Sequence, residues 1–108
     1  MSDERIELNS EELRQKINLE TGSIEWSELV KHFAKGMVVV IGTELDLIKV
    51  AECFAADDRA QVAQWIDEEK ISRAQDDDAR RWNEHNTEFW SVVVAPWVLV
   101  QEKSKDLN

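Results

Sequence analysis

The run FWSVVVAPWVLV, residues 89–100, contains two extended apolar stretches separated by a proline. Its first part, residues 89–95, is rich in valine, whose β-branched side chain favours strands. This run predicts a strand in the centre of a sheet. Pro96 cannot donate a backbone hydrogen bond to a neighbouring strand, so it predicts a bulge, a bend or an edge, and residues 97–100 are expected to resume in extended conformation.

Residues 37–41 predict a second strand. This segment, MVVVI, lies between Gly36 and Gly42. It is too short for a buried helix but has the length and the β-branched residues of a buried strand. Residues 71–74 are ambiguous and indicate at most a single strand pairing.

Helix-start signals and apolar periodicity indicate five helices. Residues 9–12 have the pattern of an N-cap followed by a glutamate three positions later. Ser23 is expected to cap the second helix, Thr43 the third and Asp58 the fourth, and the acidic run 76–78 favours the positive end of the fifth. The predicted helices cover residues 10–20, 24–35, the segment from Thr43 to about 56, 59–69 and 77–84.

These elements predict an α+β fold in which four or five helices pack on a small, mainly antiparallel sheet of two to four strands. The third and fourth helices, separated by Asp57-Asp58, give the fold a winged-helix-like appearance: a helix-turn-helix followed by strands. The expected core consists of Leu29, Phe33, Val39, Ile41, Leu47, Phe54, Val62, Trp65, Ile66, Val92 and Val94.

Composition sets the class of protein. The chain has 108 residues, within the range of about 50 to 200 that is usual for one domain. We expect a single domain over residues 1–108, with an ordered part from about 9 to 103 between a polar N-terminus and a C-terminal tail. Because 43% of the residues are hydrophobic, the chain can build a core, and disorder throughout is excluded.

Location is indicated by three features. One cysteine cannot form an intramolecular disulfide and fits a reducing compartment, and the N-terminus lacks the basic and apolar regions of a signal peptide. The longest uncharged run, residues 89–101, is shorter than the roughly 18 residues that span a bilayer. We therefore expect a cytoplasmic protein with no membrane segment.

The sequence has no pattern typical of a catalytic or metal-binding site. His32, Cys53 and His85 lie on three separate predicted elements, so no two of them share a turn as metal ligands usually do. The run 76–78 lacks the alternating spacing of a calcium loop, and the three glycines form no phosphate-binding loop. The acidic residues Glu44, Asp46, Asp57 and Asp58 could pair as acid and base, but close pairs are expected in so acidic a chain. We expect no catalytic residues, metal or cofactor.

Charge weakens the helix-turn-helix interpretation. A recognition helix over 59–69 would present Arg59, Gln61, Gln64, Asp67 and Glu68 outward. Proteins bind DNA largely by neutralising phosphates, whereas this chain has a net charge of −10 and no basic tail or patch. A hairpin used for packing is the simpler explanation.

The chain has five tryptophans and no tyrosine. Trp26 and Trp65 lie on apolar helix faces and are expected in the core. Trp82, Trp90 and Trp97 lie around a loop and the Pro96 interruption, so one or two of them could be exposed. Exposed tryptophan is enriched at binding hot spots, which points to a protein partner or a small ligand.

Several segments together resemble a known family. The most specific are LDL at 45–47 and PWVLVQE at 96–102. Further matches are 38–40, 48–51, 57–58, Val62, 65–66, Trp82 and 92–95. Over about residues 24–103 the chain resembles the uncharacterised bacterial family named domain of unknown function 2288 (DUF2288). The resemblance implies a small bacterial cytoplasmic protein, and because no activity is assigned to that family, it implies no functional residues.

Three hypotheses for function remain open. The first is a non-catalytic protein-interaction or regulatory module that binds an unidentified protein through an apolar, tryptophan-bearing surface. The second is a helix-turn-helix nucleic-acid binder that overcomes its charge by dimerising or through basic residues around Arg59, Arg80 and Arg81. The third is an enzyme or small-ligand domain, which would show a pocket with converging polar groups near Cys53, His32 or His85.

Overall fold

The structure, a computed structural model, describes residues 10–103. The N-cap expected at Asn9 and the tail expected beyond Lys103 lie outside the described residues. Within that range no helix is long and apolar enough to cross a membrane. The elements are α1 (Ser10–Glu20), β1 (Gly22–Glu25), α2 (Trp26–Ala34), β2 (Val38–Ile41), α3 (Leu47–Ala55), α4 (Arg59–Asp67), β3 (Ile71–Arg73), α5 (Asp76–His85), β4 (Glu88–Val94) and β5 (Trp97–Glu102).

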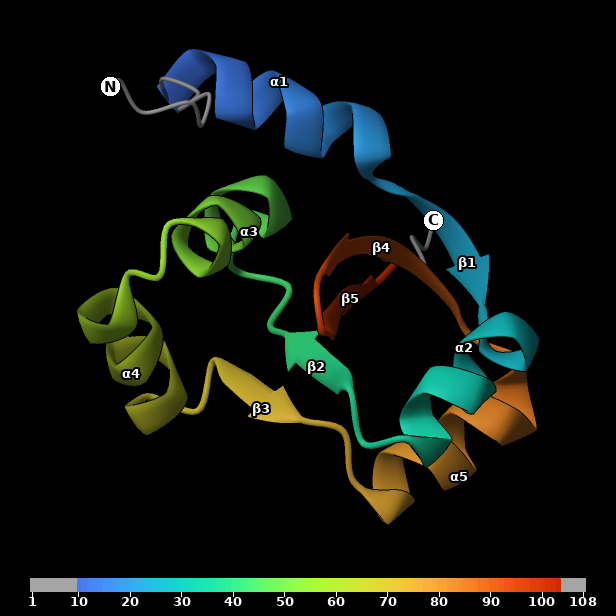
Figure 1. The fold of residues 1–108 in the computed structure, drawn as a ribbon. Coiled ribbons are helices and arrows are strands. Elements are labelled where there is room, and N and C mark those ends of the chain that lie inside the picture. The colour runs from blue at the N-terminus through green and yellow to red at the C-terminus, as the bar shows by residue number, and fades with distance from the viewer. Residues whose placement is uncertain (1–9, 104–108) are drawn as a thin grey trace.

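All five strands form one sheet in the order β1-β4-β5-β2-β3 (Figure 1). The β2–β5 pair is parallel and the other three pairs are antiparallel. The predicted α+β class with a mainly antiparallel sheet is therefore confirmed, but the sheet has five strands and not the two to four expected. The strand expected in the centre, β4, is paired on both sides, but β5 occupies the middle position.

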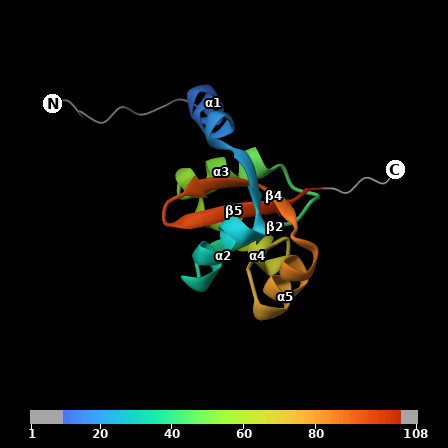
Figure 2. The same cartoon turned by 90° about the vertical axis from the view of Figure 1, so that its right-hand side faces the viewer.

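Helices cover both faces of the sheet. On one face α1, α3 and α4 contribute Ile17, Leu47, Val50, Ala51 and Trp65 to a buried cluster with β2, β3, β4 and β5. On the other face α2 and α5 build a second cluster around Trp26, Leu29 and Trp82. Figure 1 shows α3 and α4 on one side of the strands and α2 with α5 on the other, and Figure 2 shows α1 lying above α3.

The second cluster is aromatic. Trp82 is completely buried. Its ring centroid lies 5.0 Å from that of Phe89 on β4 and 5.7 Å from that of Trp26 on α2. The Trp82 indole donates a hydrogen bond of 2.9 Å to the Glu102 carboxylate at the end of β5. This contact fixes α5 against the sheet, because a buried indole N–H needs an acceptor.

Side-chain caps explain where α3 and α4 begin. The Asp46 carboxylate accepts a hydrogen bond from the Ile48 N–H at the start of α3, so Thr43, expected in this role, is not the cap. The Asp58 carboxylate accepts from the Gln61 N–H and caps α4, as expected. At α5 the acidic run 76–78 forms the first turn.

The start of the second helix differs from the prediction. Residues 24–35 were expected to be helical from a Ser23 cap, but residues 22–25 form β1 and the helix begins at Trp26. The cause is a distant partner: β1 pairs with β4, and the Trp26 N–H donates to the Thr87 carbonyl. Pairing with a strand more than 60 residues away outweighs the local capping signal.

The predicted core is only partly correct. Leu29, Val39, Ile41, Leu47, Trp65 and Val92 are buried. Phe33, Phe54, Val62 and Val94 are only partly buried, and Ile66 is 53% exposed. Helical periodicity identifies an apolar face, but no described element covers the part of that face that carries Ile66.

The winged-helix likeness is limited to the α3–α4 pair. A wing is a hairpin that projects from the domain, whereas the β4–β5 hairpin is flanked by β1 on one side and β2 on the other. The strand that follows α4 is β3, an edge strand of the same sheet. The hairpin therefore belongs to the interior of the sheet.

Replacing Trp82 with alanine is expected to lower the free energy of unfolding by about 3–5 kcal/mol, because it opens a cavity in a fully buried cluster. The matched control is Trp90→Ala, since Trp90 is 45% exposed, and its expected cost is below about 1 kcal/mol. Urea denaturation followed by circular dichroism measures both. Equal losses for the two variants would contradict this account of the core.

Asp58→Ala removes the cap of α4 and is expected to lower the free energy of unfolding by about 1 kcal/mol, because the Gln61 N–H loses its acceptor. Asp58→Asn retains an acceptor oxygen at the same place and should keep most of the stability. The same denaturation measurement compares the two variants. A loss of equal size in both would mean that the charge of Asp58, and not its hydrogen bond, stabilises α4.

Candidate functional site

An apolar groove lies between α3, α4 and the sheet. Two adjoining cavities of about 500 and 850 Å³ share Phe54 on α3, Val62 and Ile66 on α4, and Trp97 on β5. We call these four residues the apolar groove. They are the partly buried or exposed members of the face on which α3 and α4 pack.

The turn between α3 and α4 positions α4, which forms one wall of the apolar groove. Asp57 adopts a positive φ of 59°, and the Asp58 N–H donates to the Cys53 carbonyl, which ends α3 and redirects the chain. Val62 and Ile66 then lie four residues apart on the same side of α4. Trp65 is α4's only buried side chain, so α4 is anchored to the core by a single residue.

The floor of the groove crosses several strands. Val39 on β2 lines it between Arg73 on β3 and Trp97 on β5, and Val94 and Ala95 extend it to the end of β4. The Arg73 guanidinium lies 5.6 Å from the Trp97 ring and donates a hydrogen bond of 2.7 Å to the Gly36 carbonyl. This stacking holds a cation at the β3 end of an otherwise apolar surface.

Charged residues mark the margins of the groove. Asp57, Asp58 and Arg59 lie at one end, and Glu69 and Arg73 at the other. Arg59 pairs with Asp57 at 3.3 Å, but both side chains are more than 70% exposed, so water screens the pair. An apolar centre with a charged rim is the usual composition of a protein-binding surface.

The three residues considered as metal ligands or nucleophiles do not converge. His32 lies on α2, Cys53 on α3 and His85 at the end of α5. Among residues 10–103 no group of three His, Cys, Asp or Glu side chains could hold a metal ion. The carboxylates considered as an acid–base pair include Asp46 and Asp58, which cap helices.

His85 does line a polar cavity, of about 660 Å³, together with Arg81, Glu88, Glu102 and Lys103. Its charged groups are paired with one another: Arg81 with Glu102 at 2.9 Å, and Lys103 with Glu88 at 3.8 Å. The hydrogen bond to Glu102 raises the pKa of Arg81. The cavity therefore offers mutually compensated charges to a small ligand.

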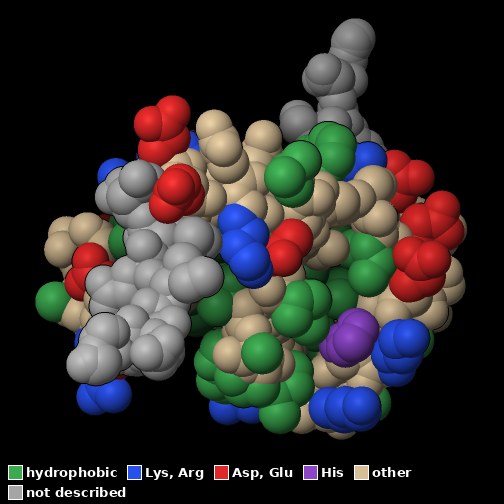
Figure 3. All heavy atoms as spheres, turned by 45° about the horizontal axis from the view of Figure 1, so that its top comes forward, with side chains coloured by type: hydrophobic (Ala, Val, Ile, Leu, Met, Phe, Trp, Pro, Cys, Tyr) green, Lys and Arg blue, Asp and Glu red, His purple; other side chains and the backbone are tan. Residues whose placement is uncertain are grey.

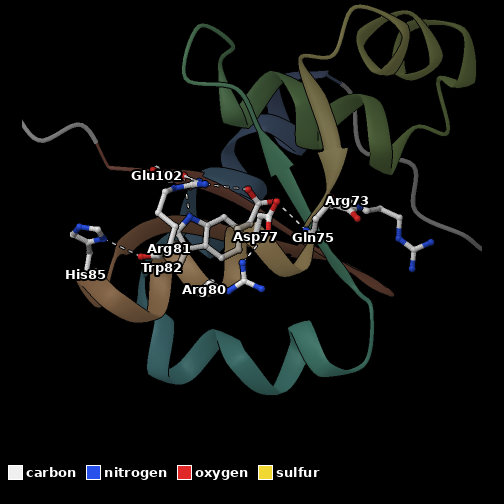
Figure 4. A network of polar contacts seen from close by, with 9 residues as sticks. Arg73, Gln75, Asp77, Arg80, Arg81, Trp82, His85 and Glu102 are labelled. Atoms are coloured by element: carbon white, nitrogen blue, oxygen red, sulfur yellow. Dashed lines mark hydrogen bonds and ion pairs between the residues drawn. The ribbon is translucent and has the colours of Figure 1, made fainter.

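The basic residues considered for nucleic-acid binding do not form a patch. Arg59 pairs with Asp57, Arg80 with Asp77, and Arg81 with Asp78 and Glu102. Figure 4 shows Arg81 and Trp82 directed toward Glu102, with Arg80 separate from them. On the face seen in Figure 3, Lys and Arg side chains are scattered among Asp and Glu side chains.

Two of the residues expected to face outward on α4, Gln64 and Glu68, are bonded to one another. The Gln64 amide donates to the Glu68 carboxylate at 3.1 Å, and this bond lowers the pKa of Glu68. Lys70 also pairs with Glu68, at 3.4 Å. An ionised carboxylate on this side of α4 opposes an approaching phosphate.

The tryptophans divide into three environments. Trp26 and Trp65 are buried as expected, and Trp82 is buried as well. Trp97 is partly buried in the groove. Trp90 is 45% exposed, with the Lys103 ammonium 4.2 Å from its ring centroid.

Of the four groove residues, Phe54, Val62 and Ile66 belong to the core that the sequence predicts, and Trp97 does not. No sequence signal separates them from core residues, because Val62, Trp65 and Ile66 have the i, i+3, i+4 spacing of an ordinary core-facing stripe. The uncovered width of that stripe becomes the groove wall.

The Cys53 thiol should react slowly. Burial raises its pKa and nearby Asp58 raises it further, so less of the reactive thiolate is present at neutral pH than in free cysteine. Alkylation by iodoacetamide at pH 7 is expected to be slower than that of free cysteine and to accelerate when urea unfolds the chain. A rate above that of free cysteine would instead indicate an activated nucleophile.

Comparison with known proteins places the chain in a family. No match is found among curated proteins. Among solved structures, the chain is similar to the NMR solution structure of PA1075 from Pseudomonas aeruginosa, with 37% sequence identity, a TM-score of 0.77, and coverage of 99% of this chain and 98% of that one. The family model described as a protein of unknown function, DUF2288, matches residues 12–102. The chain therefore belongs to the DUF2288 family.

Proposed function

We propose that this protein is a non-catalytic interaction module and that the apolar groove binds an apolar segment of a partner protein. The observation that carries this proposal is the groove itself: Phe54, Val62, Ile66 and Trp97 form one continuous apolar surface beside a five-stranded sheet. Contiguous exposed apolar surface of this kind commonly marks an interaction site.

The exposure of Ile66 supports the proposal. Its side chain is 53% exposed beside partly buried Val62 and Trp97, so a partner that covers it removes apolar area from water. Trp97 adds an aromatic ring already held in place by the Arg73 guanidinium. A pre-positioned aromatic side chain loses little conformational freedom on binding, which favours affinity.

The other two hypotheses have less support. Nucleic-acid binding would be favoured by a surface of net positive charge, but Arg59, Arg80 and Arg81 each lie beside a carboxylate and the chain has a net charge of −10. A small polar ligand in the His85 cavity would have to compete with ion pairs already formed there.

Ile66→Lys is expected to abolish partner binding, because it places a charge in the centre of the apolar groove. The chain offers a matched control in Val93→Lys, since Val93 is 57% exposed on the opposite face of the sheet. Both variants should fold, because neither residue is buried. The measurement is quantitative affinity purification of each tagged protein from its native host, with nuclease added.

The pattern of retention decides the outcome. A stoichiometric protein retained by the wild type and by Val93→Lys but lost by Ile66→Lys supports the proposal. Retention by Ile66→Lys, or loss only with nuclease, would reject the groove as the binding site.

A further inference from the structure

The outer edge of β3 has backbone groups that the sheet does not use. In the β2–β3 pair the Gly42 N–H donates to the Lys70 carbonyl at 2.8 Å, and the Ala74 N–H donates to the Val38 carbonyl at 3.0 Å. Hydrogen-bonded pairs alternate in an antiparallel ladder, so residues 70, 72 and 74 face β2. The N–H and C=O groups of Ile71 and Arg73 therefore point away from the sheet.

Only one of those four outward groups has a partner among residues 10–103. The Arg73 carbonyl accepts a hydrogen bond of 3.1 Å from the Gln75 side chain. The Ile71 N–H and carbonyl and the Arg73 N–H remain as two donors and one acceptor. Such a row is the template on which an extended peptide adds as a new strand.

The apolar groove adjoins this edge. The larger cavity is lined by Ile66, Glu69, Ile71 and Arg73, so it opens where β3 ends the sheet. Ile71 and Arg73 lie opposite Ile41 and Val39, which belong to the cluster on the α3–α4 face. Side chains of an added strand that lie opposite Ile71 and Arg73 would therefore point to the same face as the groove.

We infer that β3 binds an extended segment of the partner as a sixth, antiparallel strand with the sequence pattern acidic–any–aliphatic. This inference rests on the proposed function and specifies how the groove is used. In antiparallel pairing the residue opposite Arg73 precedes the residue opposite Ile71 by two positions. The aliphatic side chain lies beside Ile71 and Ile66, and the acidic one pairs with Arg73.

Arg73 is suited to this role because its guanidinium is incompletely used. It stacks on Trp97 and donates to the Gly36 carbonyl, which leaves further N–H donors for a carboxylate. Figure 4 shows its side chain extending away from the α5 network. Opposite charges facing one another across a strand pair stabilise that pair.

A second copy of the chain fits the edge poorly. Pairing two β3 strands through both outward residues places Ile71 of each copy opposite Arg73 of the other, which matches neither side chain. Two chains of net charge −10 also repel one another. An extended partner segment avoids the mismatched Ile71–Arg73 pairing, and its single acidic residue is repelled far less than a second chain of charge −10.

The first test detects the added strand directly. The peptide Ser-Thr-Glu-Thr-Ile-Thr-Ser, blocked at both ends, is titrated into the isotopically labelled full chain, and amide hydrogen exchange is followed by NMR. Exchange at the Ile71 and Arg73 amides is expected to slow. The Ser23 and Glu25 amides point outward at the opposite edge, on β1, and should be unaffected.

The second test reverses the charge. In Arg73→Glu the affinity for the glutamate peptide is expected to fall about fivefold, and a peptide with lysine in place of glutamate should bind about fivefold better than it does to the wild type. The control is Arg80→Glu, which reverses an exposed arginine on α5 and should change neither affinity. Preference for the glutamate peptide would run against the field of a −10 chain, so it reports the local contact with Arg73.

The outcomes separate the two proposals. If the Ile71 and Arg73 amides stay unprotected at saturating peptide, or Arg73→Glu does not reverse the preference, strand addition is wrong even where Ile66→Lys still abolishes partner binding. Protection that rises with protein concentration alone would mean that a second copy occupies the edge. If Ile66→Lys has no effect on the partner while the edge binds peptide, the groove proposal fails and strand addition stands without it.

Discussion

The hydrogen bond from the Trp82 indole to the Glu102 carboxylate connects α5 with β5, the middle strand of the sheet. Trp82 is completely buried, so its N–H must find an acceptor inside the protein. Arg81 contacts the same carboxylate and compensates its charge, as Figure 4 shows. With α5 fixed in this way, Trp26 and Phe89 pack on the Trp82 ring, and α2 is held on the same face.

The two faces of the sheet are therefore unequal. On the α2–α5 face Trp26 and Phe89 pack against the buried Trp82 ring, whereas on the other face α4 is held by one buried side chain, Trp65. A helix with a single anchor leaves its flanking apolar residues uncovered, as exposed Ile66 shows. The groove is the result of this difference in packing, and it lies next to the sheet edge that has unused backbone donors.

Much of the fold could be predicted from the sequence because its causes are local. The cap at Asp58, the acidic start of α5 and the valine-rich strand 89–95 act over a few residues, and the structure contains all three features. β1 was not predicted, because its partner β4 lies far along the chain and no local signal reports the pairing. The groove was missed for a related reason: periodicity gives the apolar face of α4, but what covers that face is decided by elements elsewhere.

The parallel pairing of β2 with β5 has a consequence for how the protein folds. β5, residues 97–102, is the last described strand in the sequence. It lies between β2 and β4, in the middle of the sheet. Until it arrives, β2–β3 and β1–β4 are two separate strand pairs with open inner edges. Unpaired inner edges are exposed to other nascent chains, and contacts of long sequence separation form slowly. A chain in which β5 has not yet inserted therefore exposes the strand edges that the native fold buries deepest.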